Sequence, residues 1–300
     1  MAAIFVNDVT AQSKDRAIST FSSVLVRPMT GTDRDLDGAL SLSQAVHWPY
    51  RRDDWSLALE LGQGLLAEVD GQIVASTLWW SYGDAFATCG IIIVSPAMQG
   101  RGLGRALMEN MLEATGDRAL LLNSTEEGHR LYESFGFSDI STVHQHQAQL
   151  PDVLSAFPAG PVRNMRAGDL PAIAKMDEQA FGAERTRLIE SFNRIGTSAV
   201  IERNGSIEGF AMCRPFGLGH AVGPVVAATA GDAQSLIRHF MVEKPGGFLR
   251  VDTTGDSGLG DWLTAQGLPE VGHVTTMIRG QRPPAAGQAR IYGLASQSFG

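Results

Sequence analysis

Three glycines stand within five positions in the stretch VSPAMQGRGLGRAL. Gly100, Gly102 and Gly104 follow an apolar run and precede a helical pattern. Successive glycines let backbone N–H groups converge on an anion, and the N-terminus of a following helix adds donors and partial positive charge. Arg101 and Arg105 bring positive charge beside them. The stretch therefore predicts a phosphate-binding turn, with a tight turn that holds no ligand as the alternative.

Two nucleotide-binding motifs with glycine-rich turns do not fit this stretch. The dinucleotide fingerprint G-x-G-x-x-G would place Arg105 at its third glycine if read from Gly100, and Leu107 if read from Gly102. The next apolar run, ALLLNS, does not end in the carboxylate that this fingerprint needs. The P-loop string G-x-x-x-x-G-K-[ST] does not occur in the sequence. A pyrophosphate held by backbone N–H groups is the reading that remains.

The elements that would position this turn follow from the periodicity of its flanks. An apolar, β-branched run predicts a strand over 86–94, and a helical stripe predicts a helix over 102–115. A hairpin over 64–80 precedes them, and a strand over 118–123 and a helix over 125–135 follow. This order indicates a mixed α/β fold of the α+β type, with a mostly antiparallel sheet flanked by helices. The helix after the turn is expected to pack through Leu103, Ala106, Leu107, Met111 and Ala114.

The pattern occurs twice along the chain. The stretches VLVRPMTGTDRDLDGALSLSQA, LLAEVDGQIVAST and YESFGF resemble GPVRNMRAGDLPAIAKMDEQA, AVIERNGSIEGFA and LTAQGL, in the same order and at nearly constant offsets. Asp70-Gly71 and Asn204-Gly205 are the dipeptides that type I′ hairpin turns prefer. We therefore predict two tandem domains of one fold. The predicted division is an N-terminal extension over 1–20, domains over 21–150 and 161–300, and a proline-rich linker over 151–160.

Composition limits the classes of partner. The chain has 300 residues and a formal net charge of −8, which disfavours a nucleic acid or a membrane surface, because both attract basic patches. Cys89 and Cys213 form no C-x-x-C pair and indicate a reducing compartment. The N-terminal stretch MAAIFVNDVTAQSKDRAIST lacks the apolar core of a signal peptide, and the apolar runs are far shorter than the ~18 residues of a membrane span. We expect a cytoplasmic protein.

The stretch VSPAMQGRGLGRAL resembles the acyl-CoA motif of the GNAT superfamily of N-acyltransferases, a strand that often reads V-x-P followed by [Q/R]-x-x-G-x-[G/A]. Gln99, Gly102 and Gly104 fill this motif. Farther on, LLLNSTEEGHRLYESFGF resembles the family's next strand and its helix with L-Y-x-x-x-G-F. The resemblance covers 24–145 closely. In the second half GPVVAATAGDAQSL takes the place of the motif without a glycine triad, so the chain resembles a tandem member with a degenerate second domain.

The resemblance implies which residues bind acyl-CoA. The glycine turn would hold the pyrophosphate, and the pantetheine amides would pair with the central strand, where two strands of the fold splay apart. Asn123 stands at a strand end, and Thr125 stands where many members carry an asparagine; Thr125 as a helix cap is the alternative. The cofactor-binding residues implied are Ile92, Ile93, Val94, Gln99, Gly100, Arg101, Gly102, Leu103, Gly104, Arg105, Asn123 and Thr125.

The same resemblance implies that Tyr132 is the general acid. A phenol, with a pKa of about 10, is a plausible proton donor to a departing thiolate of similar basicity. The alternative is that Tyr132 is a core aromatic beside Leu131 and Phe135.

The general base is open, because the central strand FATCGIIIV has no glutamate. Glu68, Asp84 and His47 are candidates through a water relay, and each is also explained as ordinary surface. Cys89 on the central strand suggests an acyl-cysteine intermediate, and a small buried hydrophobe is the favoured alternative.

Three further stretches allow two interpretations each. HWPYRRDDW, from His47 on, would cover the acceptor pocket in this fold or form a loop with a hydrophobic anchor. His144 and His146 share one face of a strand and could ligate a metal, but with no third ligand we expect a solvent-facing strand and no metal. The second domain is expected to be a wall of the acceptor site or a packing partner for the first. Its tail RIYGLASQSFG would expose apolar side chains unless Ile291–Phe299 packs back on the protein.

The expected activity is therefore transfer of an acetyl group from acetyl-CoA to an amine by direct attack. The acceptor would be a small molecule or a peptide N-terminus, and the chain a monomer or homodimer without nucleic-acid or membrane partners. A non-catalytic acyl-CoA sensor is the second hypothesis, and a structural tandem that binds no ligand is the third. Both of the first two need the intact turn, and only the enzyme needs Tyr132 and an amine pocket.

Overall fold

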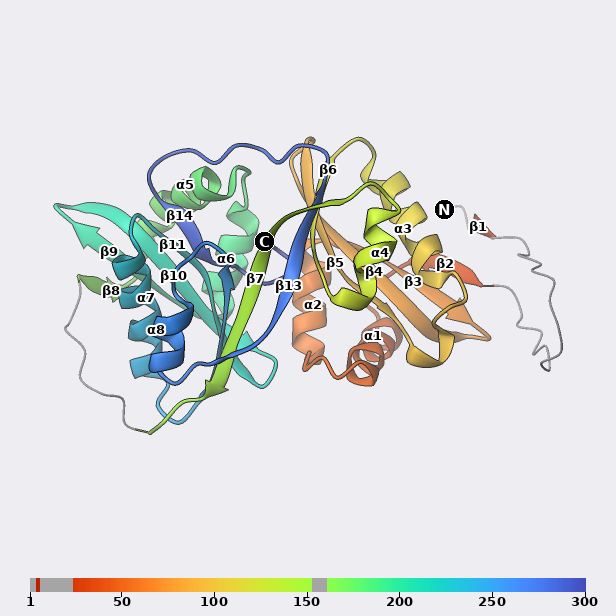
Figure 1. The fold of residues 1–300 in the computed structure, drawn as a ribbon, viewed down its shortest axis with the longest axis horizontal. Helices are drawn as coiled ribbons and strands as arrows, with labels where there is room; N and C mark the ends of the chain where they lie inside the picture. The colour runs from red at the N-terminus through yellow and green to blue at the C-terminus, as the bar shows by residue number, and fades with distance from the viewer. Residues whose placement is uncertain (1–3, 6–23, 153–160) are drawn as a thin grey trace. The chain divides into compact units, whose positions relative to one another are not determined.

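The structure is a computed structural model that describes residues 4–5, 24–152 and 161–300. The predicted N-terminal extension lies outside the described residues except for Ile4–Phe5, and the predicted linker lies outside them except for Pro151 and Asp152. The described residues form two compact units, one within 4–80 and 91–116 and one within 81–90 and 117–300, and Figure 1 labels their elements.

The first unit contains an antiparallel sheet in the order β1-β2-β3-β4, and the C-terminal half of β5 follows β4. The turn between β3 and β4 is a tight hairpin turn as predicted, because Asp70 and Gly71 both have positive φ, 50° and 76°. Its elements are β1 (Ile4–Phe5), β2 (Leu25–Pro28), α1 (Asp33–Ala45), α2 (Arg52–Leu61), β3 (Gln63–Val69), β4 (Gln72–Tyr82), β5 (Phe86–Val94), the 3₁₀ helix η1 (Pro96–Met98) and α3 (Leu103–Thr115).

Helix α3 packs against the strands through a stripe that differs in part from the predicted one. Leu103 and Leu107 join a core cluster with Val26, Ala67 and Ala75 from the strands.

The predicted contact of Ala114 is wrong, since Ala114 is exposed and Ala106 is only half-buried. Met108 and Thr115 are buried instead. The stripe follows an i, i+4 line from Leu103, which turns Ala114 to the outer side of the helix.

The second unit holds a larger, mostly antiparallel sheet in the order β5-β6-β13-β7-β12-β14-β11-β10-β9-β8, with β5 represented by its N-terminal half. The pairings β5–β6 and β11–β12 are parallel. Its elements are β6 (Ala119–Ser124), α4 (Glu126–Glu133), β7 (Ser138–Gln149), β8 (Val162–Asn164), η2 (Ala167–Asp169), α5 (Leu170–Phe181), α6 (Thr186–Ile195), β9 (Thr197–Arg203), β10 (Ser206–Phe216), β11 (Gly219–Ala227), α7 (Ala230–Glu243), β12 (Phe248–Thr254), α8 (Gly260–Ala265), β13 (Glu270–Arg279) and β14 (Arg290–Gly293).

The two sequence repeats exchange their last long strands within this unit. Strand β7 closes the first repeat but pairs with β12 of the second, over 143–149 and 248–254. Strand β13 belongs to the second repeat but pairs with β6 of the first, where Thr276 lies opposite Asn123. The boundaries of the compact units therefore differ from those of the sequence repeats. Where each domain begins and ends in the sequence stays a prediction.

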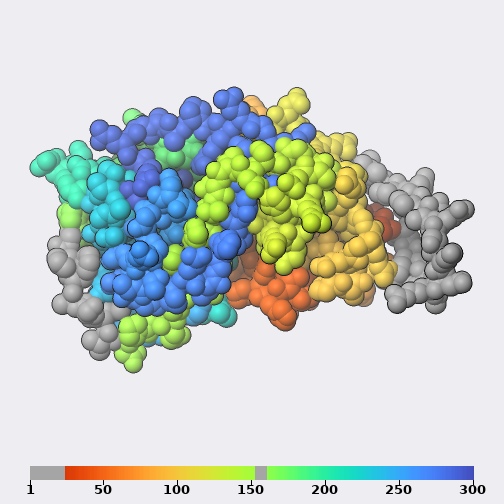
Figure 2. All heavy atoms as spheres, in the orientation of Figure 1, coloured from red at the N-terminus to blue at the C-terminus, as the bar shows by residue number. Residues whose placement is uncertain are grey.

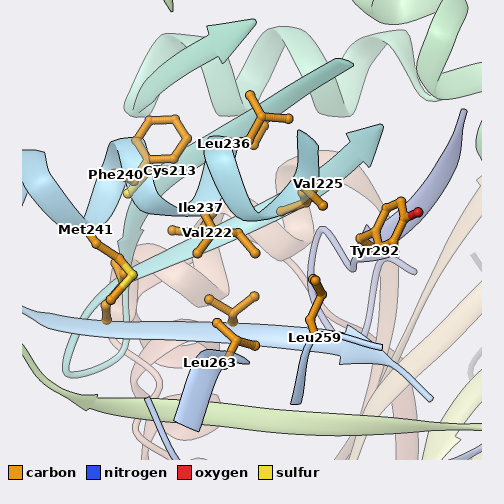
Figure 3. Packing of buried hydrophobic residues seen from close by; sticks show 14 of the residues in the cluster. Cys213, Val222, Val225, Leu236, Ile237, Phe240, Met241, Leu259, Leu263 and Tyr292 are labelled. Atoms are coloured by element: carbon orange, nitrogen blue, oxygen red, sulfur yellow. The ribbon is translucent and has the colours of Figure 1, made fainter. Parts of the chain in front are cut away.

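The core of the second repeat includes the strand near the C-terminus. Figure 3 shows Tyr292 of β14 with Val225 of β11 and side chains of α7, such as Leu236. Ile291 and Phe299 are also buried, as the apolar spacing of the tail predicts. The segment between β13 and β14 is mostly exposed and appears on the face drawn in Figure 2.

The mixed α/β class and the mostly antiparallel sheet are confirmed. The second hairpin turn is also as predicted, with φ of 52° at Asn204 and 77° at Gly205. Among the described residues, no helix has the length and apolarity that crossing a membrane requires.

Candidate functional site

The predicted site residues lie in both compact units, and each group is considered within its own unit. Ile92–Val94 and the turn from Gln99 to Arg105 belong to the first unit. Asn123, Thr125 and Tyr132 belong to the second.

The glycine turn requires glycine because of its backbone conformation. Gly100 and Gly102 have φ of 74° and 81°, values that residues with a side chain rarely adopt. A Cβ added at either position would meet nothing within 4 Å, so crowding does not explain them. Gly104 lies inside α3. The space where side chains would stand is therefore open beside the start of the helix.

The N-terminus of α3 offers backbone donors. Gly102 is the N-cap residue and has no side chain that could accept from the first turn. The helical ladder starts with the bond from Ala106 N–H to the Gly102 carbonyl, 3.0 Å, so the N–H groups before Ala106 are the helix's N-terminal donors. Arg101 and Arg105 are exposed on either side of these donors. This arrangement can hold an anion such as a pyrophosphate.

The turn is tied back to β5. The Gln99 side-chain amide donates to the Val94 carbonyl over 3.3 Å. Leu103 is 3 % exposed and anchors the first turn of α3. Ile93 is buried, whereas Ile92 and Val94 are half-buried.

A distortion in β5 was not predicted from the sequence. Ile91 has a φ of 52°, which is rare for a β-branched residue, and its carbonyl accepts from the buried Ser76 hydroxyl over 3.0 Å. Such kinks re-aim a strand and cluster at functional sites. The run FATCGIIIV gives no sign of it except Gly90, because isoleucine normally favours a regular strand.

In the second unit, Tyr132 lies in α4 and is 8 % exposed. Its ring centroid lies 6.2 Å from that of Phe137, so it packs against this residue. Gly128 stands one turn earlier, where a Cβ would lie 2.8 Å from Cε2 of the tyrosine ring. Burial, and to a smaller extent nearby Cys89, raises the pKa of the Tyr132 phenol. The phenol therefore stays protonated at neutral pH, as a proton donor must.

Asn123 connects two other parts of the second unit. Its side-chain NH₂ donates to the Gln297 carbonyl over 2.7 Å, and its side-chain oxygen accepts from the Thr276 hydroxyl over 2.7 Å.

Thr125 stands at the N-cap position of α4, but its hydroxyl does not cap a backbone N–H. It donates to Glu127, and the backbone N–H of Glu127 together with this hydroxyl lowers the pKa of the Glu127 carboxyl. Thr125 thus occupies the predicted helix-cap position, but its hydroxyl bonds to a carboxylate and not to a backbone N–H.

The parallel ladder between β5 and β6 is short. It joins 86–88 to 119–121 and, among the described residues of the second unit, Cys89 and Gly90 do not continue it. This is the region where the resemblance implies that two strands splay apart.

The matching region of the second repeat is filled by the chain itself. The parallel ladder between β11 and β12 joins His220–Ala221 to Leu249–Arg250. Beyond it β14 enters between the two strands, and Gly293 lies opposite both Val225 of β11 and Thr253 of β12. The strand thus supplies the hydrogen-bonding partner that a separated pair of strands needs.

Helix α7 also differs from α3 at its N-terminus. The N-cap Thr229 hydroxyl accepts from the Asp232 N–H over 3.2 Å. The Asp232 carboxylate lies in the first turn and binds Arg203, with Oδ1 to Nη2 at 2.5 Å. A carboxylate at a helix N-terminus is stabilised by the helix dipole. This helix end therefore already has its own anion.

The residue aligned with Tyr132 is Leu263. Each helix ends in the same way, with the Phe137 N–H bonded to the Tyr132 carbonyl and the Leu268 N–H bonded to the Leu263 carbonyl. The second repeat thus has no phenol at this position.

The candidate bases and the candidate nucleophile have different surroundings. Glu68 is 7 % exposed and binds Arg27 and Arg34, and these partners lower the pKa of its carboxyl even though burial acts to raise it. Asp84 is exposed in a turn. Burial raises the pKa of the Cys89 thiol to about 12, which favours the inert thiol over a nucleophilic thiolate.

The prediction that His144 and His146 lie on a solvent-facing strand is wrong. His146 is 1 % exposed, and its Nδ1 lies 3.1 Å from the Leu268 carbonyl. His144 Nδ1 lies 3.0 Å from Glu270 Oε1. The exchange of strands buries this face of β7, which the sequence pattern could not reveal. Among the described residues there is no cluster of three or more metal-ligating side chains.

The stretch from His47 to Trp55 has a hydrophobic anchor. Trp55 is fully buried, and its indole N–H donates to the Ser43 hydroxyl over 3.2 Å. The Tyr50 ring lies between those of Trp48 and Trp55, with centroids 6.3 and 5.8 Å away. Its contact with an acceptor stays a prediction.

Comparisons with known proteins identify the fold twice along the chain. Models of the acetyltransferase (GNAT) domain match residues 60–139 and 173–293. An uncharacterized N-acetyltransferase of Bacillus subtilis, YitH, is 23 % identical over 274 residues, which cover 89 % of this chain and 96 % of that protein. A holothin acyltransferase of a Pseudoalteromonas species is 25 % identical over 245 residues, covering 78 % and 80 %.

Solved structures show the same arrangement of elements. A putative acetyltransferase from Pyrococcus horikoshii has a TM-score of 0.78 at 20 % identity, covering 96 % of this chain and all of that one. A tandem GNAT protein from the clavulanic acid biosynthesis pathway has a TM-score of 0.61 at 16 % identity, covering 85 % and 98 %. The chain is a tandem member of the GNAT acetyltransferase family, and this membership supports N-acyltransferase activity.

Proposed function

We propose that the protein is an acetyl-CoA-dependent N-acetyltransferase whose acceptor is an amine of a small molecule or a peptide. The observation that carries this proposal is the N-terminus of α3, where Gly100 and Gly102 leave backbone donors open. A pyrophosphate suits such a site because its charge is stabilised by the helix dipole and its oxygens accept from several N–H groups. Bound acetyl-CoA would supply a thioester that the amine attacks directly.

The residues of β5 and Gln99 support the same cofactor. The kink at Ile91 departs from regular strand geometry just before 92–94, where the pantetheine amides would pair with the backbone. The Gln99 side chain, which donates to the Val94 carbonyl, would shape the same segment. Asn123 and Thr125 are proposed as further contacts. Both hydrogen-bond within the protein, so a contact with the cofactor would add to these bonds or replace them.

Tyr132 is proposed as the general acid that protonates the departing thiolate. Burial keeps its phenol protonated at neutral pH, and the proton would move from the phenol oxygen to sulfur as the carbon–sulfur bond breaks. The attacking nitrogen would lose its own proton to water.

We propose that only the first repeat binds acetyl-CoA. In the second repeat Asp232 stands at the N-terminus of α7, and β14 lies between β11 and β12. A negative carboxylate and a filled strand gap both oppose a negatively charged, extended ligand. The second domain would therefore be degenerate in chemistry but not in fold.

The test combines calorimetry with thiol release. Titration with acetyl-CoA should give one site per chain, and addition of a panel of amines should release free CoA thiol. Binding without release for any amine would favour the acyl-CoA sensor. Two sites per chain would overturn the assignment to the first repeat, and no binding would overturn the proposal as a whole.

A further inference from the structure

Three glutamine side chains form a row in the second unit. Gln145 donates through Nε2 to Gln147 Oε1 over 3.0 Å, and Gln297 donates through Nε2 to Gln145 Oε1 over 3.4 Å. All three are half-buried, so the row keeps access to solvent. The carboxamide row is defined as Gln147, Gln145 and Gln297.

The row lies beside the ion pair of Arg250 and Asp252, whose charges compensate each other. Gln145 and Gln147 occupy alternate positions of β7 and therefore share a face, and they lie opposite Asp252 and Arg250 of β12. Arg250 binds Asp252 with Nη2 to Oδ2 at 3.0 Å, and Gln297 Nε2 lies 3.2 Å from Asp252 Oδ1. The surface is thus rich in hydrogen-bonding groups, and its two charges compensate each other.

The loop that carries Gln297 is held firmly at its other end. Arg185 is fully buried, is paired with Asp177, and donates to the carbonyls of Phe299 and Gly300 over 3.2 and 2.7 Å. The Tyr82 hydroxyl also donates to the Phe299 carbonyl, over 3.0 Å. Figure 1 shows the C-terminus beside β7, in agreement with the bond from Gln297 to Gln145.

The same loop brings the row to the strand of the proposed reaction. Ser298 Oγ lies 3.1 Å from the position that a Cβ on Gly90 would take, so a side chain there would require Ser298 to shift by a few tenths of an ångström. Gly90 follows Cys89, which is near enough to Tyr132 to influence its phenol. The row therefore begins next to the N-terminal half of β5 and extends along β7.

We infer that the carboxamide row binds the part of the acceptor beyond its amine, and that this part carries uncharged hydrogen-bonding groups, an amide or hydroxyls. The inference rests on the proposed acetyltransferase function. Carboxamides donate and accept at once, which matches amides and hydroxyls. An acceptor with a carboxylate or phosphate there would find no net positive charge in the row and its ion pair.

The test uses pairs of amines of equal length, one with a hydroxyl or amide and one with an alkyl group, competing for the same enzyme preparation. The ratio of their rates does not depend on how much enzyme is folded. The wild type should prefer the hydrogen-bonding amine, and Gln145→Met should reduce this preference about three- to tenfold, the value of one hydrogen bond. Acetyl-CoA affinity should not change. Gln297→Met should act in the same direction, and the exposed Gln281→Met is the matched control.

Two outcomes would overturn the inference: a wild type with no preference between the paired amines, or a folded Gln145→Met variant that keeps the full preference. Absence of thiol release with every amine would instead refute the proposed function. In that case, calorimetric binding of the hydroxylated amine to the wild type and to Gln145→Met still tests the row, since a row that binds the amine must lose affinity in the variant.

Discussion

The two repeats have nearly the same ion-pair network and very different helix N-termini. In the first repeat Arg27 binds Asp35 and Glu68, and in the second repeat Arg163 binds Asp169 and Glu202. In each case the arginine also donates to the carbonyl of the residue that follows it. This network joins the first strand, the first helical segment and the next strand of each repeat, so it belongs to the scaffold.

The differences are concentrated where a ligand would bind. The open turn before α3 corresponds to the capped start of α7, and Tyr132 corresponds to Leu263. The short ladder between β5 and β6 corresponds to a gap filled by β14. A fold can thus be kept by its core and ion pairs after the groups suited to a cofactor have been replaced.

The largest expected effect is on cofactor binding. Gly102→Val should abolish acetyl-CoA binding by calorimetry, because a β-branched residue cannot hold a φ of 81° without strain and would move the donors of α3. Gly205→Val is the matched control, since Gly205 also has positive φ and open space around it but lies in the hairpin of the second repeat. Equal loss of binding in both variants would mean that general destabilisation, not the turn, is responsible.

The turnover rate should distinguish a catalytic role of Tyr132 from a packing role. Tyr132→Phe keeps the ring beside Phe137 and removes only the hydroxyl, so the rate should fall about 10²- to 10⁴-fold while acetyl-CoA affinity is kept. Tyr292→Phe removes a phenol from the core of the second repeat and should leave the rate unchanged. An unchanged rate in Tyr132→Phe, under conditions where chemistry limits, would make this residue a packing aromatic.

These outcomes also bear on what the sequence can reveal. The glycine turn, the hairpin turns and the helix with Tyr132 depend on local signals, namely positive φ at glycine and apolar periodicity, and they were predicted. The exchange of β7 and β13 was not, because strand pairing depends on which partner is available in the folded chain and not on the pattern of either strand.

The same reason explains the errors at particular residues. His146 reads as the polar member of an alternating strand, yet the exchanged strand places it in a buried position. The kink at Ile91 contradicts the preference of isoleucine, and only tertiary contacts can impose it. Thr125 has the residue type of a helix cap, but a neighbouring carboxylate takes its hydroxyl.

A smaller effect is expected from opening the N-terminus of α7 in the second repeat, so that it resembles that of α3. Thr229→Gly with Asp232→Asn removes the cap and the anion from the start of α7, and should lower the free energy of unfolding by about 1–2 kcal/mol. Calorimetry should still find one acetyl-CoA site, because β14 remains between β11 and β12. A second site in this variant would show that the capped helix, and not the inserted strand, excludes the cofactor.

The smallest expected difference is the one in stability between the two ion-pair networks. Burial acts to raise the pKa of the Asp35 carboxyl, but hydrogen bonds from Arg27 and Thr30 outweigh it and lower the pKa to about 2. A carboxyl whose pKa is lower in the folded than in the unfolded chain stabilises the fold above the unfolded value of about 3.9, and this stabilisation is lost as the pH falls toward 2. Asp169 has a lowered pKa for the same reason, its bond to Arg163, but its side chain is 13 % exposed against 2 % for Asp35.

Urea unfolding at pH 7 should therefore show a loss of about 2 kcal/mol for Asp35→Asn and about 1 kcal/mol for Asp169→Asn. Between pH 4 and pH 2 the wild type should lose more stability than Asp35→Asn does, and parallel losses would show that Asp35 does not carry this part of the acid sensitivity.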